Sequence, residues 1–100
     1  MLGLLGLTWV NKADKERYHK LADLGCIVCL HNGIYTPPAI HHTDGRTKPG
    51  ANKKTIGLCG AHHQTGGEGV AFHATGRKTW EAKYGKEADL LAETNRLINA

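Results

Sequence analysis

Cysteine and histidine residues gather in two short stretches of this chain, and both residue types can bind metal ions. The first stretch, CIVCLHNGIYTPPAIHH, spans residues 26–42, and the second, LCGAHHQTGGEGVAFH, spans residues 58–73. Thiolate sulfur and imidazole nitrogen are donor atoms that zinc prefers. An imidazole can also take up a proton near neutral pH. The chain can therefore bind metal and move protons, and the spacing of these residues indicates how many sites it has.

A Cys-x2-Cys pair and a Cys-x2-His pair predict one closed zinc site. A gap of two residues lets both side chains of a pair reach the same ion, and four N or S ligands complete a tetrahedron. The predicted ligands are Cys26, Cys29, Cys59 and His62. His31 is the alternative fourth ligand. Such a site would stabilise a domain of this size, whose core is small.

Cysteine usage favours metal over disulfide bonds. The chain has three cysteines in 100 residues, and an odd number cannot all pair within one chain. The apolar opening, residues 1–10, lacks the basic start and cleavage site of a secretion signal and is too short to span a bilayer. We expect it to be a first strand or a packing segment. These features predict a protein of the reducing cytoplasm, although the cysteines could instead be small buried hydrophobes.

Four histidines remain when the zinc site is complete: His41, His42, His63 and His73. Adjacent residues of a helix point about 100° apart, so His62 and His63 should face different sites. Successive residues of a strand point to opposite faces, so His41 and His42 should not bind the same ion. A site with two or three histidine ligands keeps open positions, as a catalytic metal requires. We therefore predict a second, open site with a histidine nearby as general base.

Helices and short strands must position these residues. Residues 11–24 predict an amphipathic helix that Asn11 caps and Gly25 ends. Its expected apolar face consists of Ala13, Tyr18, Leu21 and Leu24. Residues 77–85 and 86–100 predict two further helices, with Leu90, Leu91, Leu97 and Ile98 of the second facing inward.

Between these helices we expect a tight turn at residues 26–29 and a strand that ends at the histidine pair. A loop over residues 43–54 and a second strand over residues 55–58 follow. Residues 59–64 predict a helical turn, and residues 65–72 a glycine-rich loop. No repeat or internal boundary is visible, so residues 1–100 are expected to form one α+β domain.

Basic residues flank the histidines, and the formal net charge is +4. Such placement suits a polyanionic partner such as nucleic acid. Candidate phosphate contacts, which position a strand without reading its sequence, are Arg46, Lys48, Lys53, Lys54, Arg77 and Lys78.

Together, Cys-x2-Cys, IHHTDGR, LCGAHH and a further histidine resemble the HNH endonuclease motif, a ββα-metal arrangement with an embedded zinc. More narrowly, HHTDGRTKPGANKKTIGLCGAHHQ…GVAFHATGRKTWEAKYG is similar to the phage recombination-enhancement nucleases called Ref, which act with the host recombinase RecA. The resemblance covers residues 26–85. It implies an HNH-like nuclease domain with flanking helices in the cytoplasm of a bacterial host, with DNA and RecA filaments as partners and neither a membrane nor a small-molecule substrate.

The resemblance also implies a role for each remaining histidine. His42 lies where HNH enzymes keep the general base, and His41 lies where they commonly supply a metal ligand. His63 and His73 match the later ligands. His42 would deprotonate the water that attacks a DNA phosphodiester, and the ion would stabilise the developing charge. The ion would be Mg2+ in the cell, although histidine ligands also accept Zn2+, Mn2+ or Ni2+.

The chain departs from the HNH pattern in two places. The middle asparagine of the motif has no clear counterpart, because Asn52 is available but Lys54 lies nearer the usual position. Nine residues separate His63 from His73, which is more than in many HNH enzymes. Two alternative functions are a zinc-stabilised DNA-binding or recombination accessory module without catalysis, and a purely structural phage component.

Overall fold

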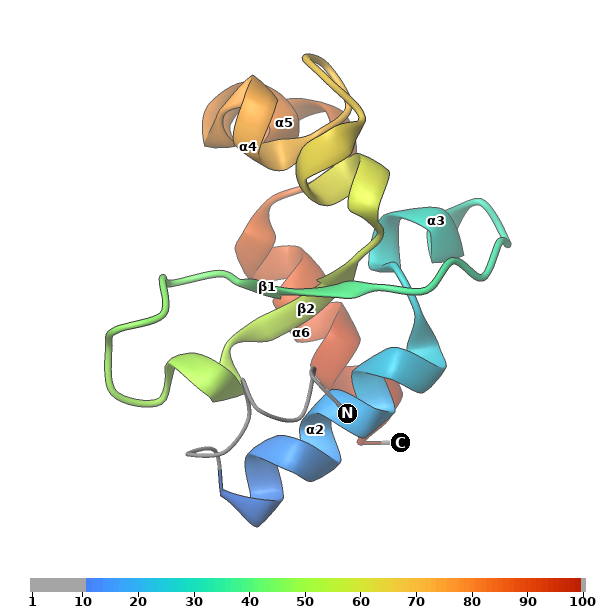
Figure 1. Ribbon diagram of the computed structural model, residues 1–100. Coiled ribbons are helices and arrows are strands. Elements are labelled where there is room, and N and C mark those ends of the chain that lie inside the picture. The colour runs from blue at the N-terminus through green and yellow to red at the C-terminus, as the bar shows by residue number, and fades with distance from the viewer. Residues whose placement is uncertain (1–10, 100) are drawn as a thin grey trace.

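An antiparallel hairpin carries the first two histidines. The computed structural model describes residues 11–99, and the apolar segment at residues 1–10 lies outside this range. Strand β1 (Ala39–His42) pairs with β2 (Thr55–Leu58), with His41 opposite Ile56 (Figure 1). Both strands form where the sequence predicts them. The connection over residues 43–54 contains one short 3-10 helix, η1 (Ala51–Lys53).

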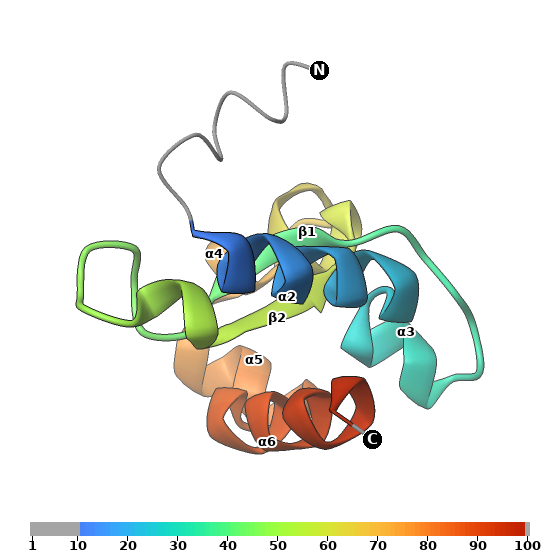
Figure 2. The same ribbon diagram turned by 90° about the horizontal axis from the view of Figure 1, so that it is seen from below.

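Helix α2 (Lys12–Leu24) precedes the hairpin and packs against β2 (Figure 2). The side chain of Asn11 caps it by accepting a hydrogen bond from the backbone N–H of Asp14, and Gly25 follows its end at a φ of 86°. The expected inward face is partly wrong, because Ala13 is exposed and Asp14 is buried. A buried carboxylate needs a hydrogen-bonding partner, and Asn52 provides one.

The predicted tight turn after α2 is the start of a short helix, α3 (Ile27–His31). Cys26 is its N-cap residue, and the Cys26 sulfur lies 3.5 Å from the backbone nitrogen of Cys29. Helical geometry therefore brings the two cysteine side chains to the same end of α3.

Helical segments complete the fold after β2. They are η2, a π-helical turn (Ala61–Thr65), then α4 (Phe72–Thr75), α5 (Arg77–Tyr84) and α6 (Glu87–Ile98). The predicted glycine-rich loop is shorter than expected because Phe72, which is buried, begins α4. In Figure 1, helix α6 lies behind the hairpin, and η2, α4 and α5 lie above the hairpin. None of the helices within residues 11–99 is both long and apolar enough to cross a membrane.

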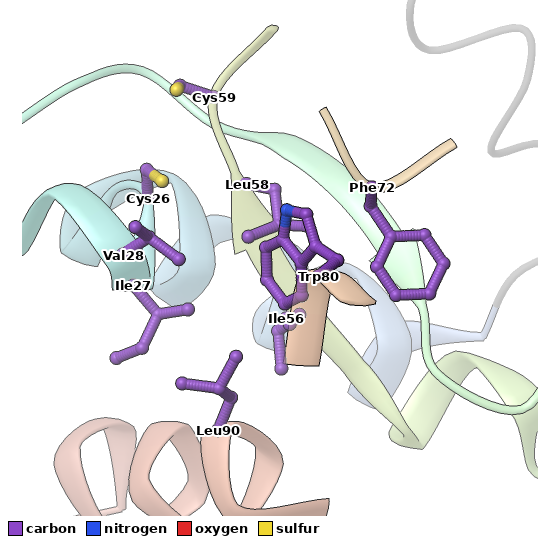
Figure 3. Close-up of a cluster of buried hydrophobic side chains, with 9 residues drawn as sticks. All are labelled: Cys26, Ile27, Val28, Ile56, Leu58, Cys59, Phe72, Trp80 and Leu90. Atoms are coloured by element: carbon purple, nitrogen blue, oxygen red, sulfur yellow. The ribbon is translucent and has the colours of Figure 1, made fainter. Parts of the chain in front are cut away.

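The hydrophobic core lies between the hairpin and these helices (Figure 3). The indole of Trp80 is fully buried; its ring centroid lies 5.2 Å from that of Phe72, and its Nε1–H donates to the carbonyl of Val70. Leu90 of α6 packs into the same cluster, whereas Leu91, Leu97 and Ile98 are only partly buried. Trp80 therefore fixes the loop that leads into α4 and its histidine.

Candidate metal centres

Three cysteines and one histidine meet beside the core and form what we call the zinc cluster: Cys26, Cys29, Cys59 and His62. Their ligand atoms all lie within 4.8 Å of one another. The sulfur atoms of Cys29 and Cys59 are 3.8 Å apart, and the Nδ1 atom of His62 lies 3.1–3.6 Å from the three sulfurs. Zinc–sulfur bonds of about 2.3 Å in a tetrahedron give sulfur–sulfur edges of about 3.8 Å. The donor set and its spacing are consistent with zinc.

Two pKa shifts in this cluster bear on metal binding, and they act in opposite directions. Burial raises the pKa of the Cys26 thiol to about 11, so a positive ion must displace its proton before the sulfur can be a thiolate ligand. Burial, and then the charge of Lys83, lowers the pKa of His62, which favours the neutral imidazole that metals bind. His31, the alternative ligand, lies outside the cluster, where its Nε2 atom is 2.7 Å from a carboxylate oxygen of Glu93 on α6.

The second group, which we call the histidine cluster, consists of His41, His63 and His73, again with ligand atoms within 4.8 Å of one another. The Nε2 atoms of His63 and His73 are 3.1 Å apart, and the ring of His41 packs on Phe72. A cleft of about 330 Å³ opens at the cluster and is lined also by His42. Burial, and then the charges of His41, His73 and Arg46, lowers the pKa of His63 to about 4. At neutral pH the ring of His63 is therefore uncharged.

The π-helical turn η2 separates the two clusters. His62 and His63 are adjacent in it, and the first points to the zinc cluster while the second points to the histidine cluster. The wide spacing between His63 and His73 does not keep them apart, because the intervening loop folds back onto α5. There the carbonyl of Gly69 accepts from the Lys83 ammonium and the Tyr84 hydroxyl.

His42 borders the same cleft but is not a member of the histidine cluster, and its side chain contacts the loop that follows β1 instead. Its Nε2 atom lies 3.1 Å from Oδ1 of Asn52, and the Asn52 amide nitrogen donates to the carboxylate of Asp14 at 3.2 Å. Because a carboxylate only accepts hydrogen bonds, Asp14 orients the amide so that its oxygen faces His42. The hydrogen of His42 is then on Nε2, which leaves a lone pair on Nδ1.

His41 is only 3% exposed and has a partner that the sequence does not reveal. Its Nε2 atom lies 2.6 Å from one carboxylate oxygen of Glu87, and the other oxygen forms an ion pair with Nε of Arg77 at 2.7 Å. An acidic residue in the first turn of a helix is usual near the positive end of the helix dipole. No local signal therefore distinguishes Glu87 from an ordinary surface residue.

The predicted basic residues are not equally free to contact DNA. Lys48 and Lys54 both pair with Asp44, at 3.1 and 3.6 Å, and Arg77 pairs with Glu87. Within residues 11–99, Arg46, Lys53 and Lys78 form no ion pair. Arg46 lines the cleft of the histidine cluster and also a second pocket of about 230 Å³, which Asp14, Asn52 and Lys53 line as well.

The hairpin, the zinc cluster and the open histidine cluster define a small α+β domain suited to binding two metal ions. A family model described as recombination enhancement, RecA-dependent nuclease matches residues 11–99. The chain belongs to this family, and membership implies nuclease activity in recombination. The match extends beyond the motif region, residues 26–85, to include α2 and α6.

Proposed function

We propose that residues 1–100 form one HNH-type nuclease domain that hydrolyses DNA phosphodiester bonds with RecA filaments as its partner. The observation that carries the proposal is the shared cleft of His42 and the histidine cluster, in a chain that belongs to a nuclease family. Hairpin, η2 and α4 supply the histidines in the order of a ββα-metal motif. A nuclease of this type needs a cation, a base and a place for a phosphate, and the cleft offers candidates for each.

His41, His63 and His73 would hold the catalytic divalent ion, and the zinc cluster would hold a structural zinc. The catalytic ion, when bound, would neutralise charge on the phosphate and on the leaving oxygen. Three imidazoles suit Zn2+ or Ni2+, whereas Mg2+ prefers oxygen ligands and would need water at its other positions. A comparison of nicking rates with each of these ions therefore identifies the ion that supports activity.

His42 would be the general base. With its hydrogen on Nε2 and donated to Asn52, its Nδ1 lone pair is the atom available to take a proton from water. Asn52 would thereby serve the base directly, although it lies away from the usual position of the motif's asparagine.

Arg46 is the basic residue best placed to hold a phosphate near the reaction. It lines the cleft, it lines the adjoining pocket with Lys53, and it forms no ion pair within residues 11–99. A DNA strand that leaves the cleft across Arg46 would meet Lys53 next, whereas Lys48 and Lys54 would have to give up Asp44 to contribute. Such contacts would position DNA without sequence preference.

A nicking assay tests this function. Supercoiled plasmid is incubated with wild type, His42→Ala or His19→Ala, with EDTA, Mg2+, Mn2+, Zn2+ or Ni2+, and with or without RecA filaments. We expect His42→Ala to lower the nicking rate by about 10²- to 10⁴-fold while zinc content and DNA binding are kept. His19 is exposed on α2, so His19→Ala is the matched control and should cut like wild type.

Nicking by His42→Ala at the wild-type rate would exclude His42 as the base. If wild type binds DNA but cuts it under none of these conditions, the protein is instead the zinc-stabilised accessory module without catalysis.

A further inference from the structure

Glu87 is a carboxylate buried in the wall of the histidine cluster, and it comes from the C-terminal helix rather than from the motif. It is 5% exposed, and both of its oxygens are engaged, one by His41 at 2.6 Å and one by Arg77 at 2.7 Å. Its backbone N–H donates to a carboxylate oxygen of Glu81 at 2.6 Å, which fixes the start of α6. Contacts at the carboxylate and at the backbone therefore fix the position of the Glu87 side chain.

We propose that Glu87 is a positioning residue that fixes His41 in the tautomer able to bind the catalytic ion through Nδ1. An ionised carboxylate only accepts hydrogen bonds, so the ring nitrogen facing Glu87 must carry the hydrogen. That nitrogen is Nε2. The lone pair of His41 is then on Nδ1, whereas His63 and His73 approach each other through their Nε2 atoms.

This arrangement has a physical purpose in metal binding. A histidine ligand whose second nitrogen donates to a carboxylate is held in orientation and becomes a more basic donor, and loss of such a partner typically lowers metal affinity about 10- to 100-fold. The inference rests on the proposed function, because it assumes that His41 is a ligand. It adds a residue from α6 that touches neither the ion nor the substrate.

Arg77 makes the consequence of one substitution specific. In Glu87→Gln, Arg77 can only donate, so the new amide would turn its oxygen to Arg77 and its NH2 group to His41. The NH2 group would then donate to Nε2, and the hydrogen of His41 would move to Nδ1. The substitution should therefore block the ligand atom while hardly changing the volume of the core.

The experiment reads the tautomer and the metal affinity without DNA. Protein with only its structural zinc is labelled with ¹⁵N, and long-range ¹H–¹⁵N spectra identify which nitrogen of His41 carries the hydrogen. We expect Nε2–H in wild type and Nδ1–H in Glu87→Gln. Titration calorimetry with Ni2+ should show an affinity about 10- to 100-fold lower for Glu87→Gln.

Glu93→Gln is the matched control, because Glu93 is also on α6 and also contacts a histidine, His31, at 2.7 Å outside both clusters. It should bind Ni2+ like wild type. Retention of the structural zinc in both variants shows that the domain is folded. If Glu87→Gln binds Ni2+ as tightly as wild type, or if wild-type His41 carries its hydrogen on Nδ1, the inference is wrong while the proposed nuclease stands. If wild type binds no second ion, both are wrong.

Discussion

The side chain of Asn52 links the proposed base to the first helix, since it contacts both His42 and Asp14. Asn52→Ala removes the acceptor for Nε2 of His42, so the ring can rotate and exchange tautomers. Misplacement of a catalytic group by about 1 Å can cost about 100-fold in rate. We expect the nicking rate to fall between about 10- and 100-fold, with DNA binding unchanged, as measured by plasmid nicking and by fluorescence anisotropy.

The control for this prediction is Asn32→Ala, because Asn32 is exposed in the turn after α3 and lies in neither pocket. It should leave nicking unchanged. Equal activity of Asn52→Ala and wild type would show that His42 needs no support from α2.

Arg46 and Lys48 provide a second test at the scale of single residues, because they are two positions apart but differ in pairing. Arg46 lines the cleft without an ion pair in residues 11–99, whereas Lys48 is held by Asp44. Arg46→Ala should weaken DNA binding and reduce the slope of log affinity against log salt by about one. Lys48→Ala should change both much less. If Lys48→Ala instead has the larger effect on DNA affinity and on the salt slope, the DNA does not run across Arg46.

Local spacing was sufficient to find the zinc cluster, because the two residues between Cys26 and Cys29 fix how far apart the side chains can lie. The partners of the strand histidines could not be found in this way. Glu87 lies 46 residues from His41, and Asp14 lies 38 residues from Asn52. Those contacts depend on how α6 and α2 pack on the hairpin, which no local pattern encodes. The sequence also placed Ala13 rather than Asp14 on the buried face of α2. That error has the same cause, because the packing of α2 on the hairpin decides which residues of the helix are buried.

At the scale of secondary structure, the sequence predicted the long helices and both strands well. The cap at Asn11, the glycines after α2 and α5, and the apolar periodicity are local features, so α2, α5 and α6 lie where expected. The short elements were predicted less well. Helices α3 and α4 have five and four residues, too few to show a periodicity, and long-range packing decides their conformation.

Gly57 of β2 lies where the hairpin meets the end of α2, and it tests this packing. A Cβ atom there would lie 2.6 Å from the carbonyl oxygen of Gly25 and 2.8 Å from Cβ of Pro38. Backbone must move to make room, so Gly57→Ala should lower the free energy of unfolding by about 1–3 kcal/mol. Urea denaturation of the zinc-loaded protein measures this.

Gly60→Ala is the control, because Gly60 is exposed, has a helical φ of −51°, and its added Cβ would meet only Thr65 at 3.6 Å. It should be neutral or stabilising by up to about 1 kcal/mol. Equal stability of Gly57→Ala and wild type would mean that α2 and the hairpin are free to separate.

At the scale of the whole molecule, the two clusters would make different contributions. The zinc cluster joins three parts of the chain: the first turn of α3, the end of β2, and η2. The histidine cluster is partly exposed and opens into a cleft. A closed site of this kind supplies folding free energy, whereas an open site leaves positions for substrate. Loss of each ion should therefore have a separate effect.

Graded chelation should remove the two ions in order. The ion at the histidine cluster should leave first, with loss of nicking and no change in far-UV circular dichroism. The zinc should leave later together with the fold, because structural zinc contributes about 10–16 kcal/mol of apparent binding free energy in zinc-finger peptides and the core of this domain is small. Metal content is measured beside circular dichroism at each step.

Cys26→Ser should lose the zinc and the folded signal, whereas His63→Ala should lose only the ion at the histidine cluster. A folded, zinc-free Cys26→Ser protein would show that the hydrophobic core around Trp80 holds the domain together without metal.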